Sequence, residues 1–430
     1  MDASYIKNLK TPIAVIGLGK SGNSALNLLK EFDFQFPELV TFDEKDPLAN
    51  LQNPDQILAL SPKTLVVSPG VPLNSSWIQK LISNGAHLTS EITLASSLMT
   101  TEKIIGVTGS VAKSTVVSLL GVGAKSFDEN TFVGGNLGIP FCNYALNLIK
   151  GGPKSSWVIL ELSSYQLENC ARLSLDYSII TYLSPNHLER YSGLEDYYQT
   201  KLKITSITKK LCLYNKTSKD CEKYSVQSKS KYNLVHADNF FHPELLRRVS
   251  LIGTHNKDNF AVAAELARIC GWPEKSFQEM SRYKGLPHRL EIVTASNGVT
   301  YVNDSKATAM DSVLVAVSGC AEKISEKSTL FLLLGGKDKN LPWNELSILA
   351  SNNRVAPVFF GACGLLAKQK ANLSGEYFEK LGSAINYCQR RAQSGDIVLL
   401  SPGGTSLDEF KNFEERGDFF KSLALNSFAN

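Results

Sequence analysis

The chain has 430 residues, of which 43% are hydrophobic and 20% are charged, a composition typical of a folded protein with two or three domains. Its formal net charge of +4 is small and dispersed, so we expect no nucleic-acid partner. The eight cysteines form no zinc-spaced cluster, and no apolar run approaches the roughly 20 residues of a membrane span. The first residues lack the apolar core of a signal peptide. The sequence therefore predicts a cytoplasmic protein without a membrane partner.

Short apolar segments, each followed by a glycine-rich turn and an amphipathic stretch, recur along the chain. They lie at residues 13–17, 65–69, 104–109, 158–162, 330–336 and 397–404. This rhythm is typical of α/β domains in which helices cover parallel sheets, and such sheets bind ligands at the carboxyl ends of their strands. We place domain boundaries near Thr100 and Leu286. The predicted domains are therefore residues 1–99, 100–286 and 287–430.

The first glycine-rich turn reads GLGKSG from Gly17 to Gly22, after a predicted strand and before a predicted helix. Its Gly-x-Gly-x-x-Gly spacing alone is a dinucleotide-binding pattern, so an NAD-dependent dehydrogenase stays open at this point. Asp43 follows the next predicted strand, and Ser68 and Gly70 follow the third. A set of tight turns without a ligand is the structural alternative.

The segment IIGVTGSVAKST starts at Ile104 and predicts a strand, a turn at Gly109 and a helix that opens with Lys113, Ser114 and Thr115. Backbone amides at a helix start attract phosphate, and a lysine adds a positive charge. A hydroxyl directly after the lysine can ligate Mg²⁺. The segment therefore indicates a phosphate loop, with a capped helix bearing an exposed lysine as the alternative.

This loop departs from the complete phosphate-loop pattern at two positions. Val107 and Ala112 stand where the pattern has its two glycines. If position 112 needs a left-handed backbone, an L-residue there costs roughly 1–2 kcal/mol. That strain is tolerable, so the departure does not exclude phosphate binding.

Two later strands end in side chains that suit a metal–nucleotide site. Glu161 ends the apolar segment WVILE, and His187 follows the strand-like segment YSIITYLSP. A carboxylate beside a phosphate loop is what a Mg²⁺–ATP site requires, and a histidine can ligate a metal or move a proton near neutral pH. A helix-capping glutamate and a hydrogen-bonding histidine are the structural alternatives.

Eight motifs occur in a fixed order: GVTGSVAKST, ELSSYQLE, HLERY, GTHNKDN, GLPHRLE, YVNDSKAT, LLLGGKDK and SPGGTSLDEFKNFEERG. Together they resemble the Mur ligases of peptidoglycan synthesis over about residues 11–418, and the last four are most similar to the D-glutamate-adding members. The resemblance implies an α/β protein of three domains: a Rossmann-like N-terminal domain for the uridine nucleotide, a central P-loop-type ATPase domain and a Rossmann-like C-terminal domain for the amino acid. The implied partners are UDP-N-acetylmuramoyl-L-alanine, D-glutamate and ATP, with Mg²⁺ as cofactor, and we expect a monomer.

The resemblance also implies roles for residues that match the family motifs. UDP-substrate contacts fall on Gly19, Lys20, Ser21, Asp43, Ser68, Gly70 and Asn136. ATP contacts fall on Gly109, Lys113, Ser114, Thr115, Asn256, Asn259, Arg289, Asp304 and Lys306. The D-glutamate pocket would use Thr308, Lys339, Ser406, Leu407 and Phe413. Catalysis would use Lys113, His187, Lys201 and Arg289, and Mg²⁺ would be held by Ser114, Glu161, His187 and Lys201.

Lys201 matches the family lysine that takes up CO₂ to become a carbamate. This change turns a cation into an anion that can ligate Mg²⁺. Lys203 lies two residues further along, so a shifted alignment is an alternative, and two exposed helix lysines are another. The sequence leaves these alternatives open.

The activity implied is amide formation through an acyl phosphate. A Mur-type ligase for another amino acid is one alternative, although the SLDEFKNFEERG segment argues against it. A catalytically weak homologue that binds nucleotide or a cell-wall partner is another. Val111, Ala112 and Asn186 favour the weak homologue, because the family usually has different residues at these positions.

Overall fold

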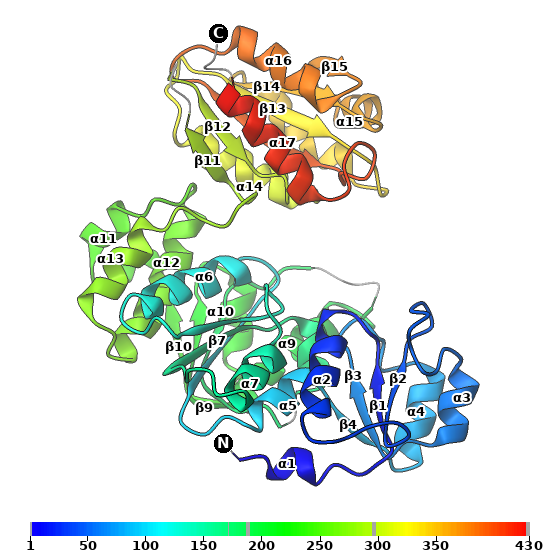
Figure 1. Ribbon diagram of the computed structural model, residues 1–430. Helices are drawn as coiled ribbons and strands as arrows, with labels where there is room; N and C mark the ends of the chain where they lie inside the picture. The colour runs from blue at the N-terminus through cyan, green and yellow to red at the C-terminus, as the bar shows by residue number, and fades with distance from the viewer. Residues whose placement is uncertain (1, 171, 186–189, 295–297, 427–430) are drawn as a thin grey trace. The chain divides into compact units, whose positions relative to one another are not determined.

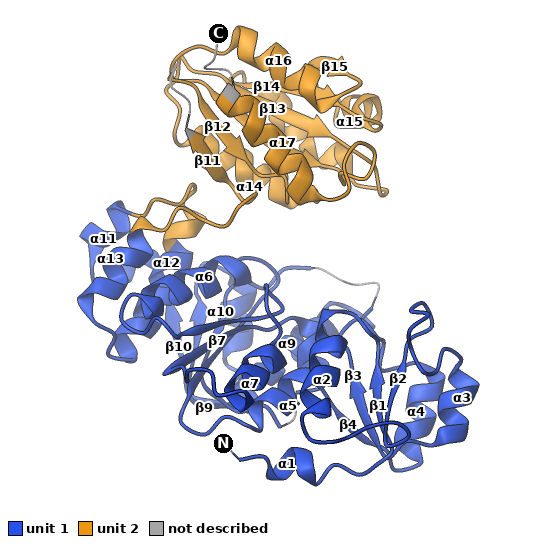
Figure 2. Cartoon of the chain, in the orientation of Figure 1, with its two compact units in different colours: residues 1–248, 258–281 blue, residues 249–257, 282–430 orange. Residues whose placement is uncertain are grey.

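The computed structural model describes residues 2–170, 172–185, 190–294 and 298–426 (Figure 1). Two compact units divide the chain: unit 1 contains residues 1–248 and 258–281, and unit 2 contains residues 249–257 and 282–430 (Figure 2). Two sheets lie in unit 1 and a third lies in unit 2. The predicted α/β class with parallel sheets is confirmed, whereas the three domain ranges stay predictions.

The first sheet has the strand order β2-β1-β3-β4, and all of its pairs are parallel. Its strands are β1 (Ile13–Ile16), β2 (Leu39–Phe42), β3 (Thr64–Val67) and β4 (His87–Thr89), and its helices are α1 (Ser4–Lys7), α2 (Lys20–Lys30), α3 (Pro54–Leu60), α4 (Ser76–Ser83) and α5 (Glu91–Ser96). Every residue of β1 is buried, because helices cover both faces of a parallel sheet. Because these strands are parallel, the carboxyl ends of β1, β2 and β3 lie at the same edge of the sheet.

The second sheet has the order β10-β9-β8-β5-β7-β6. Its strands are β5 (Lys103–Thr108), β6 (Phe132–Gly135), β7 (Trp157–Glu161), β8 (Leu175–Ile180), β9 (Thr208–Asn215) and β10 (Tyr232–Val235). The helices around it are α6 (Lys113–Lys125), α7 (Phe141–Ile149), α8 (Ser164–Glu168), α9 (Leu194–Ser206), α10 (Lys219–Ser225), η1 (Ala237–Asn239), α11 (Pro243–Arg247), α12 (His255–Ile269) and α13 (Glu274–Arg282). Because β7 and β8 flank β5 in parallel, residues that follow these three strands meet at one edge.

The third sheet has the order β11-β12-β16-β13-β14-β15, in which only β11 runs antiparallel to its neighbour among the described pairs. Its strands are β11 (Glu291–Thr294), β12 (Thr300–Asn303), β13 (Leu330–Gly335), β14 (Val355–Phe360), β15 (Glu376–Phe378) and β16 (Ile397–Gly403). The helices are α14 (Met310–Ala321), η2 (Trp343–Ser351), α15 (Gly364–Ala371), α16 (Leu381–Arg391) and α17 (Phe413–Asn426).

Strand β13 shows how this third sheet separates two hydrophobic cores. Leu330, Leu332 and Leu334 pack with α14, η2 and α15, whereas Phe331 and Leu333 pack with α16 and α17. Successive side chains of a strand point to opposite faces, so a continuous apolar run buries both faces of the sheet. Polar functional side chains are therefore expected in the turns that follow the strands, because both faces of the sheet are apolar.

Two expectations from composition concern the cysteines and the membrane. All eight cysteines are free thiols, and only Cys270 is not fully buried. Buried thiols of this kind act as small apolar core residues. Every helix in the described ranges falls short of the length and apolarity that a bilayer crossing needs.

Substituting Gly22 by alanine should destabilise the first sheet of unit 1. A Cβ at Gly22 would overlap the carbonyl oxygen of Gly17, whereas a Cβ at Gly19 would have no heavy atom within 4 Å. Overpacking of this kind costs about 1–3 kcal/mol. Gly22→Ala should lower the thermal unfolding midpoint, and Gly19→Ala should leave it unchanged. Equal midpoints for the two variants would contradict the close contact.

Candidate active site

The glycine-rich turn after β1 is held in shape by side chains that follow β2 and β3. The Asp43 carboxylate accepts hydrogen bonds from the backbone amides of Leu18 at 2.8 Å and Lys45 at 2.9 Å. These bonds, chiefly the one from Leu18, lower the pKa of Asp43. The Ser68 hydroxyl donates to the Gly17 carbonyl at 2.7 Å. The structure therefore brings three segments predicted to bind the UDP substrate to one sheet edge.

Asn136, also predicted to contact the UDP substrate, lies after β6 and contacts Glu161. Its backbone amide donates to the Glu161 carbonyl at 2.9 Å, and its side-chain amide donates to Glu161 Oε1 at 2.7 Å. Gly135 has φ +95°, and a Cβ there would lie 2.5 Å from the Glu161 carbonyl oxygen. This close approach requires glycine, so Asn136 and Glu161 form one structural pair.

The phosphate loop between β5 and α6 is anchored to the end of β8. The Thr181 hydroxyl donates to the carbonyls of Val111 at 2.6 Å and Thr108 at 3.2 Å, and the Ser110 hydroxyl donates to the Ser184 carbonyl at 2.7 Å. Ala112 precedes α6 with φ 66° and ψ −5°, a left-handed backbone. Ala112 therefore has the backbone conformation in which an L-residue is strained.

Two lysines donate to the same carbonyl in this loop. Lys113 Nζ donates to the carbonyl of Gly109 at 2.9 Å and to that of Ser110 at 3.1 Å. Lys201 Nζ, from α9, donates to the Gly109 carbonyl at 2.8 Å. Lys201 is only 1% exposed, whereas Lys203 is exposed. The buried environment favours Lys201 over Lys203 as the residue with a special role.

Burial, followed by the nearby charge of Lys113, lowers the pKa of Lys201 to about 6, and the charge of Glu161 opposes the shift. At neutral pH the Lys201 amine is therefore mostly uncharged. An uncharged amine is a nucleophile, which is the form that can react with CO₂. The chemistry expected of a carbamate-forming lysine fits this position.

Glu161 provides a test of whether a divalent cation fits beside the loop. It is 3% exposed, Oε1 accepts from Asn136, and Oε2 is buried without a hydrogen-bond partner among the described residues. A buried carboxylate oxygen is costly unless it is paired, and Mg²⁺ prefers oxygen ligands. Ser114, buried at the start of α6, would add a hydroxyl. The residues present therefore fit the cation.

Protein side chains alone do not complete a metal site in the described part of the chain. No group of three or more His, Cys, Asp and Glu residues there is close enough to hold a metal. Mg²⁺ often keeps waters and binds substrate phosphates, so a sparse protein contribution suits it. His187 and Asn186 lie outside the described residues.

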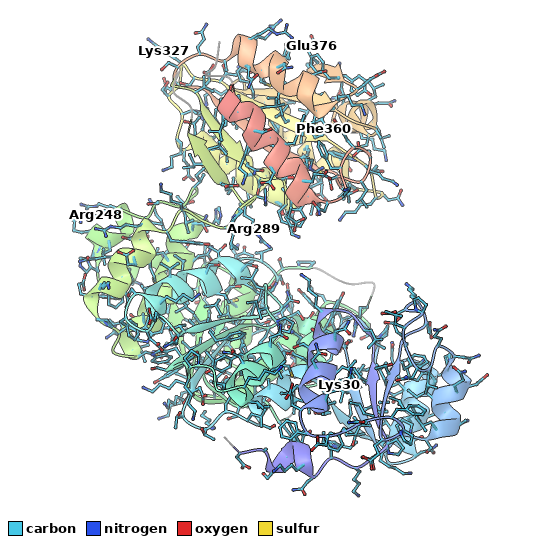
Figure 3. All side chains as sticks on the ribbon, viewed as in Figure 1. Lys30, Arg248, Arg289, Lys327, Phe360 and Glu376 are labelled. Atoms are coloured by element: carbon cyan, nitrogen blue, oxygen red, sulfur yellow. The ribbon has the colours of Figure 1, made fainter. Side chains whose placement is uncertain are left out.

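In unit 2, Arg289 lies between two residues with left-handed backbones, in the turn before β11 (Figure 3). His288 has φ 62° and Leu290 has φ 47°. The Leu290 amide donates to Asp304 Oδ1 at 3.2 Å, and the Lys306 amide donates to the His288 carbonyl at 3.1 Å. Burial raises the pKa of Asp304 to about 7. The structure thus brings together the three residues of unit 2 predicted to bind ATP from the GLPHR and NDSKAT motifs.

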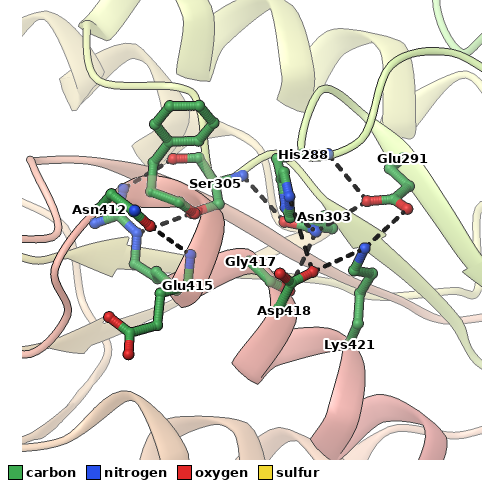
Figure 4. A network of polar contacts seen from close by, with 11 residues as sticks. His288, Glu291, Asn303, Ser305, Asn412, Glu415, Gly417, Asp418 and Lys421 are labelled. Carbon is green, nitrogen blue, oxygen red and sulfur yellow. Dashed lines mark hydrogen bonds and ion pairs between the residues drawn. The ribbon is translucent and has the colours of Figure 1, made fainter.

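A buried polar network supports this turn (Figure 4). The Asn303 side-chain amide lies 3.0 Å from His288 Nδ1 and donates to the Gly417 carbonyl at 3.2 Å and to Glu291 Oε2 at 3.1 Å. Burial lowers the pKa of His288, and the nearby charge of Lys421 lowers it further. The sequence analysis did not identify His288 or Asn303 as functional residues, although they lie within the GLPHRLE and YVNDSKAT motifs.

The residues predicted to form the D-glutamate pocket follow β12, β13 and β16 or begin α17. Ser406 is buried and Leu407 is exposed. Lys306 Nζ lies 3.7 Å from the centre of the Phe413 ring, which is only half-buried. Phe413 is therefore not a plain core residue. Thr308 is half-buried and Lys339 is exposed in neighbouring turns.

Arg416 links these turns and was also missed from the sequence. It is fully buried and donates to the Ser305 hydroxyl at 3.0 Å, the Ser305 carbonyl at 2.8 Å and the Gly404 carbonyl at 3.1 Å. The Ser305 hydroxyl in turn donates to the Phe413 carbonyl at 2.8 Å. One guanidinium therefore fixes the segments that precede Lys306 and Ser406.

The remaining residues predicted to bind ATP lie on α12. Asn256 and Asn259 are both buried, and the Asn256 side chain donates to the Ile252 carbonyl at 2.7 Å. Their spacing of three places them on one helix face. Their contacts with adenine or phosphate stay predictions.

Comparisons with known proteins agree on a single group of relatives. The family model named Mur ligase middle domain matches residues 107–267. The chain is 34% identical to the UDP-N-acetylmuramoylalanine--D-glutamate ligase of Photorhabdus laumondii, with 84% of each chain covered. It is 32% identical to the enzyme of the same name from Haemophilus influenzae, with 99% of each chain covered.

Solved structures extend this comparison to the fold. MurF ligase from Thermotoga maritima in complex with ADP has a TM-score of 0.60 at 15% identity, covering 86% of this chain and 91% of that one. MurC from the same organism, a UDP-N-acetylmuramate-alanine ligase, has a TM-score of 0.56 at 15% identity, covering 92% and 96%. At this identity the likeness shows the fold alone.

Substituting Ala112 by glycine should stabilise unit 1. Glycine adopts the left-handed backbone without the strain of roughly 1–2 kcal/mol that alanine carries. It also increases the conformational entropy of the unfolded chain, which lowers the free energy of unfolding by about 0.5–1 kcal/mol. The net gain should be about 0.5–1 kcal/mol, seen as a higher thermal midpoint. As a control, Ala124→Gly, at a buried position in the last turn of α6, should lower the midpoint. A lower midpoint for Ala112→Gly would show that the strain is absent.

Glu91 should make stability depend on pH. Burial raises the pKa of Glu91 to about 7, while its carboxylate accepts a hydrogen bond from the Cys142 amide. Between pH 5 and 7 the unfolded chain loses the proton and the folded chain keeps it, so stability should fall by up to about 1.4 kcal/mol per pH unit. Glu91→Gln should remove this slope in thermal unfolding across that range. Parallel pH profiles for wild type and variant would exclude the shift.

Proposed function

The chain belongs to the UDP-N-acetylmuramoylalanine--D-glutamate ligase family of Mur ligases, and we propose from this premise how its own residues perform the reaction. It is an ATP-dependent ligase that adds D-glutamate to UDP-N-acetylmuramoyl-L-alanine in peptidoglycan precursor synthesis. The observation that best supports the residue roles is the convergence of Lys113 and Lys201 on the Gly109 carbonyl. We propose domains 1–99, 100–286 and 287–430 for the uridine substrate, ATP and the amino acid.

The first proposed step activates the carboxylate of the UDP-linked substrate. A carboxylate does not form an amide with an amine at neutral pH, because oxide is a poor leaving group. A carboxylate oxygen attacks the γ-phosphorus of ATP, the bond to ADP breaks, and an acyl phosphate forms. Lys113, at the start of α6, would stabilise charge on the transferring phosphoryl group. Arg289, Asp304 and Lys306 would bind ATP through the turn before β11 and the turn after β12.

The second proposed step forms the amide. The amine of D-glutamate attacks the acyl carbon, and phosphate leaves from the tetrahedral intermediate. The amine must lose a proton, and His187 is our candidate base. Lys339 would pair with a carboxylate of D-glutamate, while the turn at Ser406 would offer backbone amides. Thr308, Leu407 and Phe413 would complete the pocket.

We propose that Lys201 acts as a carbamate. Its uncharged amine would attack CO₂, form an N–C bond and release a proton. The product would place an anion, rather than a second cation, beside Lys113. Glu161, Ser114, His187 and the carbamate would then hold Mg²⁺, whose charge would offset that of the triphosphate when it is bound.

We propose that this reaction takes place in the cytoplasm, because ATP and nucleotide-linked sugars are cytoplasmic metabolites. We also propose that the enzyme acts as a monomer. Every residue that we assign to a substrate comes from this one chain, so the reaction needs no second copy.

Phosphate release tests the proposed function. Purified protein with UDP-N-acetylmuramoyl-L-alanine, ATP, Mg²⁺ and D-glutamate should release phosphate, and omission of any one of the four should stop it. Lys113→Ala should lower the rate by about 10²–10³, because a preorganised charge partner of the phosphoryl group is lost. Lys125→Ala, an exposed lysine at the end of the same helix, is the matched control and should retain full activity.

Three outcomes would contradict parts of this proposal. Full activity of Lys113→Ala would exclude the phosphate loop. Equal rates with other amino acids would exclude selectivity for D-glutamate. ATP binding without turnover by the wild-type chain would favour the catalytically weak homologue, which the departures at Val111, Ala112 and Asn186 support.

A further inference from the structure

A small pocket lies in unit 1, where the carboxyl edge of the first sheet meets helix α8. Its walls are the segment after β3 (67–73), the start of α5 (90–92), helix α8 with the residue after it (165–169), and Arg190. Ser68, which we assign to the UDP-linked substrate, belongs to this wall. The pocket is therefore bounded by elements of both sheets of unit 1.

Arg190 forms a nearly buried ion pair at this pocket. Its Nε donates to Glu168 Oε1 at 3.0 Å and its Nη2 donates to Glu168 Oε2 at 2.7 Å, which is a bidentate arrangement. The side chains of Arg190 and Glu168 are only 13% and 15% exposed. A bidentate pair fixes the orientation of both side chains as well as their distance.

The same guanidinium contacts two further segments. It stacks on the ring of Tyr165, with 4.1 Å between its central carbon and the ring centre. Its Nη2 also donates to the Val71 carbonyl at 3.3 Å. The Tyr191 hydroxyl donates to Glu168 Oε1 at 2.8 Å. Arg190 therefore ties the segment after β3 to helix α8.

These contacts distinguish a positioning role from direct binding of phosphate. The positive charge of Arg190 is matched by Glu168, and one face of the guanidinium is covered by Tyr165. We propose that Arg190 and Glu168 are positioning residues that hold the 67–73 segment against α8 and so shape the pocket for the UDP-linked substrate. This inference rests on the proposed function, because that function assigns residues 1–99, which include Ser68 and Gly70, to the same substrate.

Arg190→Lys keeps the charge but loses the bidentate geometry and the contact with Val71. We expect the KM for UDP-N-acetylmuramoyl-L-alanine to rise about tenfold, which corresponds to about 1.4 kcal/mol, because the contact that holds the 67–73 segment is lost. The KM values for ATP and D-glutamate should stay unchanged, whereas the thermal midpoint should fall, because the same contacts join two elements of unit 1. Glu168→Gln should have the same effect.

The double variant tests whether the pair acts as a unit. Arg190→Lys with Glu168→Gln should raise this KM about tenfold rather than about a hundredfold, because both changes remove one interaction. Arg268 and Glu265 on α12 provide a matched control, since this pair also has bidentate contacts, of 2.9 and 2.6 Å. Arg268→Lys and Glu265→Gln should change none of the three KM values.

The outcomes separate this inference from the proposed function. A wild-type chain without substrate-dependent phosphate release would defeat the proposed function itself. With an active wild type, an unchanged KM for the UDP-linked substrate in both single variants would overturn the positioning role. A rise in all three KM values would overturn it as well, because it indicates general damage. Calorimetric titration with UDP-N-acetylmuramoyl-L-alanine should show the same tenfold weakening without turnover.

Discussion

The sharing of the Gly109 carbonyl by Lys113 and Lys201 is the constraint on which the ATP site depends. Two ammonium groups this close to one oxygen repel each other, and burial strengthens the repulsion because little water screens it. The conflict is relieved when Lys201 loses its proton, in line with its pKa of about 6. The site therefore holds one charged lysine, Lys113, beside an uncharged Lys201.

Strained backbone marks the turns to which we assign phosphate contacts. Ala112 in the phosphate loop and His288 and Leu290 on either side of Arg289 adopt left-handed conformations without being glycine. Such residues cost about 1–3 kcal/mol each and persist only where surrounding contacts over-determine them. Thr181 provides those contacts for the first turn, and the network around Asn303 provides them for the second. In both turns the strain places a cationic side chain at a strand end.

The sequence predicts the strand ends better than the contacts among them. Parallel strands bring their carboxyl ends to one edge, so apolar runs followed by Gly109 or Glu161 suffice to place these residues near each other. The choice between Lys201 and Lys203 needed burial, because residues two apart on a helix point in nearly opposite directions. The bond from Asn136 to Glu161 joins turns that are distant in sequence, and no local pattern encodes it. The buried Arg416 resembles any helix arginine until its surroundings are known.

The strand order of unit 2 also has a consequence for how the chain matures. Strand β16 lies between β12 and β13, although it is made after both of them and after β14 and β15. Until β16 leaves the ribosome, the two halves of this sheet have no common neighbour, and their apolar edges stay exposed. Unit 1 is complete in sequence well before that moment. Newborn chains should therefore depend on chaperones mainly through unit 2, because its third sheet closes late and through long-range pairing.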